Sequence, residues 1–394
     1  MNQMSIEEIK EKTSKYLFQN YGRADLAFTH GKGCILYGHD GREYLDLVAG
    51  IAVNALGYAH PEWTAAVQAQ VGRMVHVSNL FLVKEQADLA ERIASITPSG
   101  MDRTLFANSG AEANEGALKT AVRYTGRGKV LSALNGFHGR TSASLGATGQ
   151  EKYQKSFEPL ISGAYGYFPF GDCEKVKEMV DGDTAAVMVE PVQGEGGVRT
   201  VPAEFFKTVR DMCTDKGALM VCDEVQTGIG RTGEWYGIQN FGVVPDIITM
   251  AKALGGGVPI GAITTTAEIS SVMVPGTHGT TFGGNPLVSA AGCATIDIMK
   301  KEGLVAHSKE MGARWMDDLR GIHSPKIKDV RGYGLIIGVE TDSAETASHV
   351  QKYCRENGVL VNVCHGNVVR LIPPLILNDS QKDRFTSLLK EAVL

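Results

Sequence analysis

The chain is poor in the features that mark disulfide-rich or membrane-spanning proteins. Its 394 residues include seven cysteines, an odd number with no C-x-x-C pair, which argues against a disulfide framework or a structural zinc site. No apolar run approaches the roughly 18 residues that a membrane span needs. Residues 1–17 form a charged helical pattern without the apolar stretch of a secretory signal. We therefore expect a cytosolic protein.

The sequence also lacks blocks of one charge and is low in proline. Thirty-nine basic and 44 acidic residues give a net charge of −5 that is spread along the chain, which argues against nucleic acid or an anionic membrane surface as the main partner. With 13 prolines, and glycines that do not recur every third residue, both collagen and Pro/Gly-rich disorder are excluded. The composition is that of an ordinary globular protein.

Glycine, in contrast, is abundant. The chain has 47 glycines, where the ordinary usage of about 7% would give about 28. Because glycine allows sharp turns and a close approach of the backbone to a ligand, we expect the surplus to mark binding loops. Twenty of the glycines lie in six short windows, which are residues 108–111, 136–149, 194–197, 228–237, 255–261 and 276–284.

Hydrophobic periodicity divides the chain into three parts. Residues 1–60 are a lead-in whose two short strands are joined by a hairpin-type turn at His39-Asp40-Gly41. In residues 61–298, helices alternate with short apolar strands, which is typical of an α/β domain with a mainly parallel sheet. Residues 299–394 indicate a smaller α+β domain. We expect strands at 34–37, 43–47, 104–107, 129–132, 185–189, 218–222, 246–250, 261–265, 334–340, 359–363 and 368–371, and helices at 6–16, 113–124, 203–216, 304–319 and 344–357.

One motif looks like a nucleotide site but lacks the necessary context. Residues 228–233 match G-x-G-x-x-G, yet five residues separate them from the preceding strand and no amphipathic helix follows them. The sequence also has no P-loop motif and no histidine pair spaced i+3 or i+4 for a helical metal site. We therefore assign the glycine motif to the expected binding loops at the strand ends and not to a nucleotide fold.

Three of the expected strands end in groups that could bind a ligand or take part in a reaction. The strand at 104–107 leads into a helix start with serine and glycine at 108–112, the strand at 218–222 ends at Asp223, and the strand at 246–250 leads to Lys252. Ligands of open α/β sheets bind at such strand ends. A helix start suits a phosphate, a desolvated lysine can attack a carbonyl, and a carboxylate can hold a pyridine nitrogen protonated.

Together these groups indicate pyridoxal phosphate, whose ring serves as an electron sink. Taken singly, each group has an ordinary alternative. A lysine at the rim of a sheet is usually a solvated surface charge, and an acid after an apolar strand is often a helix cap. The prediction therefore depends on the occurrence of all three on successive units of the chain.

Long motifs run through the chain from about Tyr21 to its end. They are residues 50–54 (GIAVN), 137–141 (FHGRT), 190–197 (EPVQGEGG), 223–226 (DEVQ), 227–233, 245–257, 278–286 and 370–374. On these motifs the chain closely resembles the class III (subgroup II) pyridoxal-phosphate aminotransferases, in particular the acetylornithine/succinylornithine aminotransferase branch. The resemblance implies a fold type I transferase. In that fold, residues 61–298 would form the large cofactor-binding domain, and residues 1–60 would join 299–394 in the small domain.

The resemblance also implies roles in binding pyridoxal phosphate. Lys252 would bond the cofactor aldehyde and, once displaced by substrate, move the proton between the substrate Cα and the cofactor C4′. Asp223 would pair with the pyridinium nitrogen. The other implied cofactor contacts are Gln226 at the phenolic oxygen, Phe137 and Val225 on the two ring faces, Gly110 and Ala111 at the phosphate, Glu224 beside Asp223, and Thr281 at the phosphate of the neighbouring subunit. Core packing is the alternative for Phe137 and Val225.

Further positions are implied for the substrate. Arg140 would bind the α-carboxylate, because arginine recognises planar carboxylates with two parallel hydrogen bonds. Thr280 would face the substrate. Glu195 would mask Arg370 when an ω-amino donor binds and release it for 2-oxoglutarate. Glu190 would lie near the ring or serve as a buried turn carboxylate.

The implied reaction moves the δ-amino group of N-acetyl-L-ornithine to 2-oxoglutarate, in arginine biosynthesis, with the active sites at the interface of a homodimer. Two departures from the family concern the choice of donor. Tyr58 stands where histidine is usual, and residues 19–23 only approximate the lead-in motif. Succinylornithine, ornithine, 4-aminobutyrate and N-succinyl-diaminopimelate therefore remain alternative donors. A cofactor-dead binding or regulatory homologue is an alternative of another class, against which the intact Lys252 and Asp223 argue.

Overall fold

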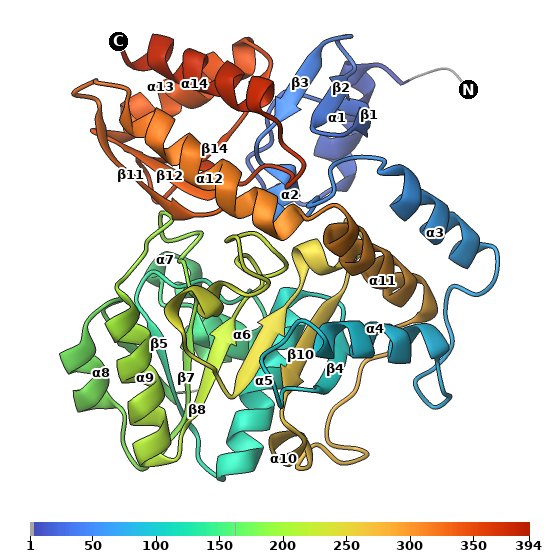
Figure 1. The fold of residues 1–394 in the computed structure, drawn as a ribbon, viewed down its shortest axis with the longest axis vertical. Coiled ribbons are helices and arrows are strands. Elements are labelled where there is room, and N and C mark those ends of the chain that lie inside the picture. Colours follow the sequence, from blue (N-terminus) through green and yellow to red (C-terminus); the bar gives the residue numbers. More distant parts are fainter. Residues whose placement is uncertain (1–3, 162) are drawn as a thin grey trace.

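A seven-stranded sheet forms the centre of the lower part of the molecule in Figure 1. Its strands in the computed structural model, which describes residues 4–161 and 163–394, are β4 (Arg103–Ala107), β5 (Lys129–Ala133), β6 (Tyr165–Phe168), β7 (Thr184–Val189), β8 (Leu219–Asp223), β9 (Ile247–Met250) and β10 (Gly261–Thr265). Their order is β4-β10-β9-β8-β7-β5-β6. All neighbours are parallel except β10, which runs antiparallel to both β4 and β9. The predicted mainly parallel sheet is thus confirmed.

Helices cover both faces of this sheet. They are α4 (Lys84–Ala94), α5 (Gly110–Thr125), α6 (Ser142–Ala147), α7 (Glu151–Gln154), α8 (Cys173–Met179), α9 (Ala203–Lys216) and α10 (Ala267–Ser270), with 3-10 turns η1 (Glu158–Leu160), η2 (Gly237–Phe241) and η3 (Lys252–Gly255). On β7, Met188 packs in one cluster with alanines of α5, whereas Val187 packs in another with Phe205 of α9. Because successive side chains of a strand point to opposite faces, a strand covered on both sides is buried along its whole length, as β7 is.

The upper part combines the two ends of the chain (Figure 1). One of its sheets consists of β1 (Phe28–Lys32), β2 (Ile35–Gly38), β3 (Glu43–Asp46) and β13 (Val359–Leu360), the last of which runs parallel to β3. The other is antiparallel and consists of β11 (Ile327–Tyr333), β12 (Ile336–Thr341), β15 (Val368–Leu371) and β14 (Asn362–Cys364). Helices α12 (Leu304–Arg320), α13 (Ala344–Glu356) and α14 (Asp379–Val393) complete it. The domain limits at residues 60 and 298 stay predictions.

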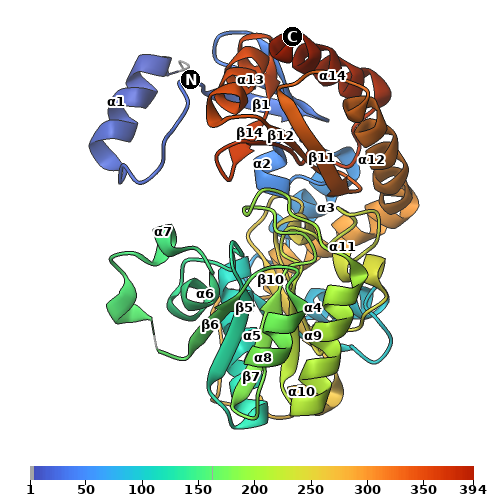
Figure 2. The same cartoon turned by 90° about the vertical axis from the view of Figure 1, so that its left-hand side faces the viewer.

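The remaining helices lie between these parts or outside them. α3 (Pro61–Val71) and α11 (Pro286–Lys301) pack against each other, and α2 (Ala49–Ala52) lies over the end of the large sheet. α1 (Ile6–Tyr16) stands apart from the body in Figure 2, and none of its residues is buried. Within the described residues, no helix is long and apolar enough to cross a membrane.

The structure corrects two details of the predicted elements. The strand expected at 359–363 is divided into β13 and β14, which belong to different sheets. The helix expected from residue 113 starts three residues earlier, at Gly110, because the Ser109 side chain caps it by accepting a hydrogen bond from the Glu112 amide. The hairpin turn at 39–41 is confirmed, with β2 and β3 antiparallel and Gly41 at φ +76°.

Candidate active site

The carboxyl ends of β4, β8 and β9 meet at a cavity of about 450 Å³. Val53, from the N-terminal part of the chain, also reaches its wall. The cavity lies where an open α/β sheet is expected to bind its ligand. Ten of the residues predicted from the sequence line it, namely Gly110, Ala111, Phe137, Arg140, Glu190, Glu195, Asp223, Val225, Gln226 and Lys252.

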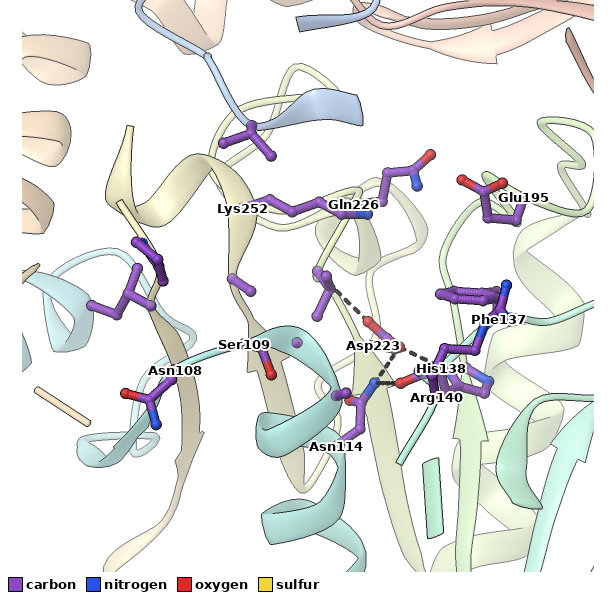
Figure 3. Close-up of a pocket in the computed structure, with 18 of the residues that line it drawn as sticks. Asn108, Ser109, Asn114, Phe137, His138, Arg140, Glu195, Asp223, Gln226 and Lys252 are labelled. Carbon is purple, nitrogen blue, oxygen red and sulfur yellow. Dashed lines mark hydrogen bonds and ion pairs between the residues drawn. The ribbon is translucent and has the colours of Figure 1, made fainter. Parts of the chain in front are cut away.

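Asp223, at the end of β8, is held in place by three neighbours (Figure 3). Its Oδ2 accepts a hydrogen bond from Asn114 Nδ2 at 2.8 Å and lies 2.7 Å from His138 Nδ1, while its Oδ1 accepts from the Val225 amide at 3.0 Å. Burial disfavours the charged imidazole, but the hydrogen bond with Asp223 and the charges of Asp223 and Glu190 raise the pKa of His138 above its usual 6.5. The carboxylate is therefore fixed in orientation by rigid elements on both sides.

Lys252 opens η3 immediately after β9. Its backbone has φ +46°, a left-handed conformation that is uncommon for a residue other than glycine and that often marks functional sites. Burial, together with the nearby Arg370 charge, lowers the pKa of the Lys252 amine, against the opposing charges of Glu195 and Asp223. Because desolvation disfavours an ammonium ion, this site favours a neutral, nucleophilic amine.

The N-terminus of α5 points its free amide groups into the same cavity. Both Gly110 and Ala111, its first two residues, line the cavity wall. A Cβ on Gly110 would lie 2.7 Å from Val225 Cγ1, so the glycine allows the helix start to approach the end of β8. The unpaired amides and the helix dipole make such an end suitable for an anion.

Phe137 and Arg140 form a further wall. The Phe137 amide donates a hydrogen bond to Glu190 at 3.0 Å, and burial raises the pKa of Glu190. Glu190 therefore combines the two roles considered for it, since it lines the cavity and also holds a turn. The Arg140 guanidinium lies 5.4 Å from the centre of the Phe137 ring and 4.1 Å from that of Tyr153, which is within the range of cation–π attraction.

Glu195 and Arg370 form an ion pair beside this wall, as the sequence predicted. Arg370 Nη1 lies 2.7 Å from Glu195 Oε1 and 3.1 Å from Gln226 Oε1. The Arg370 side chain is 1% exposed, whereas that of Glu195 is 24% exposed, so Glu195 covers the arginine. Burial alone would raise the pKa of Glu195, but Arg370 outweighs it and lowers that pKa. Gln226 thus contacts this pair as well as lining the cavity.

Four predicted residues do not line the cavity, namely Arg370, which lies behind Glu195, and Glu224, Thr280 and Thr281. The Glu224 side chain points to the opposite side of the strand end, because consecutive strand residues alternate, and it accepts hydrogen bonds from the Gly237 and Ile238 amides at 2.8 Å. Burial raises the pKa of Glu224 to about 7. Thr280 accepts a hydrogen bond at 2.8 Å from Asn108, which does line the cavity. Thr281 is exposed in this chain.

Sequence reasoning missed several residues of the site. Asn114, which orients Asp223 and donates to the His138 carbonyl at 2.6 Å, lies four positions after Gly110 on the same face of α5. That spacing was the signal that could have identified it. His138 was quoted within a motif but was given no role. Val53 comes from a distant part of the chain, and no local pattern predicts its position.

The turn that leads to Val53 is strained. We call residues 49–52 the roof turn, because they lie above Lys252 in Figure 3. Their φ values are 50°, 65°, 66° and 61°, all left-handed. Such a conformation costs roughly 1–2 kcal/mol for each residue other than glycine, and the β-branched Ile51 is an outlier there. Packing of Ala52 in a buried cluster with Val192 and Ile372 offsets part of this cost.

Known proteins resemble this chain over its full length. The family model for aminotransferase class-III matches residues 17–393. Acetylornithine aminotransferase from Methanothermobacter thermautotrophicus is 43% identical over 99% of both chains, and that from Aquifex aeolicus is 43% identical over 95% of this chain and 99% of its own.

Solved structures agree with these relatives. The ornithine aminotransferase of Toxoplasma gondii, solved with PLP partially occupying its active site, superposes with a TM-score of 0.94 at 32% identity, over 100% of this chain and 95% of its own. The acetylornithine aminotransferase of Elizabethkingia anophelis has a TM-score of 0.89 at 29% identity, over 99% of each chain. The fold predicted from the sequence is thus confirmed, and the chain belongs to the class-III aminotransferases.

Proposed function

We propose that this aminotransferase moves the δ-amino group of N-acetyl-L-ornithine to 2-oxoglutarate in the cytosol, giving N-acetyl-L-glutamate 5-semialdehyde and L-glutamate for arginine biosynthesis. The observation that carries the proposal is a single cavity that combines the amine of Lys252, the carboxylate of Asp223 and the helix start at Gly110. The name shared by the relatives at 43% identity supports acetylornithine as the donor.

Class-III aminotransferases use pyridoxal phosphate, and the cavity has the donor set for it. The start of α5 suits the phosphate, with Gly110 leaving room that a Cβ would fill. Asp223, oriented by its three neighbours, suits the pyridine nitrogen, and Phe137 and Val225 suit the ring faces. When bound, the cofactor supplies an electron sink for the negative charge that develops at the substrate Cα or Cδ.

Lys252 is proposed to act twice. Its amine, whose pKa is lowered by burial, would be the nucleophile that holds the cofactor through its aldehyde. Once the substrate amine replaces it, Nζ is free to take a proton from the substrate carbon and to return it elsewhere, as a positioned general base and acid. The carboxylate of Asp223 would meanwhile keep the pyridine nitrogen protonated.

Arg140, Glu195 and Arg370 are proposed to select the substrates. Arg140, held over two aromatic rings, would bind the α-carboxylate. The Glu195–Arg370 pair seen here would serve the ω-amino donor, because Glu195 then neutralises Arg370. For 2-oxoglutarate, Glu195 would move aside so that Arg370 binds the second carboxylate. Its partial exposure supports such a movement, and Thr280 would face the same substrate.

We further propose that the enzyme is a homodimer in which Thr281 reaches the phosphate of the neighbouring subunit. The loop before α4 and the segment around Thr281 lie together, since Asn79 Nδ2 donates to the Gly283 carbonyl at 3.0 Å. They expose adjacent large apolar side chains, and exposed apolar patches of this kind mark protein interfaces. These side chains are Leu80, Phe81, Leu82 and Phe282, which are 88%, 65%, 104% and 58% exposed. Light scattering tests the dimer.

Ornithine is the second candidate donor. The Toxoplasma ornithine aminotransferase superposes on the whole chain, and Tyr58 departs from the family near the donor end of the site. A panel of N-acetylornithine, N-succinylornithine, ornithine and 4-aminobutyrate as donors separates these activities. We expect the highest kcat/KM with N-acetylornithine.

An absorbance experiment tests the chemistry. After addition of pyridoxal phosphate, the purified protein should show a visible band, lose it with N-acetylornithine and regain it with 2-oxoglutarate. A protein that shows no visible band would be a cofactor-dead homologue, and the proposed function would be wrong.

A further inference from the structure

A buried carboxylate accepts hydrogen bonds from the backbone at the start of the roof turn. Asp46, the last residue of β3, is 2% exposed. Its Oδ1 accepts a hydrogen bond from the Val48 amide at 2.9 Å, and its Oδ2 accepts one from the Ala49 amide at 3.0 Å. These are the last two amides before the chain turns left-handed. Asp46 therefore fixes the residues from which the strained roof turn starts.

Tyr58 supplies the third hydrogen bond to this carboxylate. Its hydroxyl donates to Asp46 Oδ2 at 2.6 Å. The ring packs against β1, where a Cβ on Gly31 would be 2.5 Å from Tyr58 Cγ, so the absence of a side chain at Gly31 leaves room for the ring. The Tyr58 backbone also exchanges two hydrogen bonds with Gly33, at 2.8 and 2.9 Å. Contacts with β1 and with Gly33 thus fix both the ring and the backbone of Tyr58, independently of the hydrogen bond from its hydroxyl to Asp46.

The roof turn connects this network to the cavity. It ends at Val53, which lines the cavity wall. Ala52 packs against Val192, which lies three residues before Glu195. In Figure 3 the segment that carries the turn lies on the opposite side of Lys252 from Asp223. A displacement of the turn would therefore change the cavity wall at Val53 while leaving the hydrogen bonds of Asp223 in place.

We propose that Tyr58 is a positioning residue which, through Asp46, holds the roof turn and so sets the fit of the amino donor without touching it. The proposal rests on the proposed function, because it concerns the donor of that reaction. Left-handed residues persist only where their surroundings over-determine them. A Tyr58→Phe substitution would keep the ring against Gly31 but remove one of the three donors to a buried carboxylate.

The experiment compares Tyr58→Phe with a matched control and with a second substitution at the same position. The control is Tyr44→Phe, because Tyr44 lies in β3 like Asp46. Its hydroxyl donates at 2.6 Å to another aspartate, Asp40, in the hairpin turn. The second substitution is Tyr58→His, whose ring nitrogens lie closer to the backbone than the tyrosine hydroxyl and cannot take its place at Asp46. For each variant, KM and kcat are measured with N-acetylornithine and with glutamate, and hydrogen–deuterium exchange of residues 47–56 is measured without substrate.

We expect Tyr58→Phe to raise the KM for N-acetylornithine by about 5- to 10-fold, as the loss of one hydrogen bond to a buried acceptor implies. The KM for the shorter glutamate should rise less, kcat should change by less than about twofold, and exchange at 47–56 should accelerate. Tyr58→His should show the same defects as Tyr58→Phe, and Tyr44→Phe should leave these values unchanged.

Two results would overturn the proposal. One is a Tyr58→Phe enzyme with wild-type KM and wild-type exchange. The other is a Tyr44→Phe enzyme with the same defects, which would show a general loss of stability. Failure of the proposed function is a separate outcome, because the wild type would then not transaminate N-acetylornithine, whereas the exchange measurement would still report on the Tyr58–Asp46 hydrogen bond.

Discussion

The two ion pairs of the cavity differ in how the protein holds them. Asp223 and His138 are both almost completely buried, with side chains 4% and 1% exposed, and Asp223 is held by a strand end, α5 and the loop after β5. Glu195 and Arg370 join a loop of the large part to β15 of the upper part, and the glutamate is partly exposed. We call these the cofactor pair and the substrate pair.

The difference matches two chemical tasks. A cofactor that stays bound through many turnovers is best served by groups on rigid elements, each fixed by further hydrogen bonds. Two successive substrates of different charge need a site with two states, and a loop carboxylate over a buried arginine offers them at small cost. The structure thus combines a fully buried ion pair and a partly exposed one at the same cavity.

The largest effect should come from removing the amine of Lys252, which lies in the same cavity as both pairs. We expect Lys252→Ala to lower kcat with N-acetylornithine by about 10⁴-fold, because positioned proton transfer of this kind is worth that much, and to abolish the visible absorbance band. Lys207→Ala, at an exposed position of α9, is the matched control. Appreciable turnover by Lys252→Ala would show that another group moves the proton.

The next effect concerns the cofactor pair. Asp223→Asn keeps the shape but removes the charge, and we expect kcat to fall by about 10²- to 10³-fold with every donor, since it removes electrostatic stabilisation of a developing charge. Retention of the cofactor on dialysis should fall as well. A selective loss with one substrate only would contradict the assignment of Asp223 to the cofactor.

The substrate pair should behave differently. Glu195→Ala leaves Arg370 uncovered. We expect the half-reaction with N-acetylornithine to slow by about tenfold relative to that with glutamate, which corresponds to about 1.4 kcal/mol. Single-turnover absorbance with each substrate measures the two rates. Equal effects on both half-reactions would rule out the switch. The control is Glu340→Ala. It removes the carboxylate partner of Arg331, another arginine that connects the upper part of the molecule to the large part.

The smallest effect is a pH dependence of the cofactor-free protein. The pKa of His138 is raised in the folded protein, so its ion pair with Asp223 contributes stability that is fully present below pH 6.5 and is lost as the pH rises through the raised value. His138→Asn keeps a donor but cannot titrate. We therefore expect the fall in Tm over that pH range to be about 2 °C smaller in this variant than in the wild type. The exposed His349→Asn should retain the wild-type profile.

Local patterns predicted Asp223 but not its partner His138. Asp223, Lys252 and the start of α5 each lie at the end of an apolar strand or within three residues after it, so strand-end reasoning identified them. Glu224 was misplaced because the family motif was transferred without the alternation of strand side chains. The antiparallel direction of β10 could not be predicted from its apolar composition, since direction depends on which neighbours pair with it.

The substrate side depended on contacts between distant residues. Arg370 and Glu195 were recognised only through the family resemblance, because 175 positions separate them. The roof turn was visible as a motif, but nothing in residues 49–52 indicates a left-handed run, since alanine and isoleucine disfavour it. Its conformation depends on tertiary contacts, which local propensity does not describe.

The pairing of β3 with β13 has a consequence for the order in which the enzyme is made. The strand that leads into the roof turn ends at residue 46, yet its parallel partner is residues 359–360, and Ile372 donates a backbone hydrogen bond to Leu47 at 2.9 Å. Contacts so distant in sequence form late, and domains fold as the chain emerges from the ribosome. β3 is therefore synthesised long before β13 and must wait for it, and a nascent chain that has already built its large sheet still lacks a fixed roof turn over Lys252.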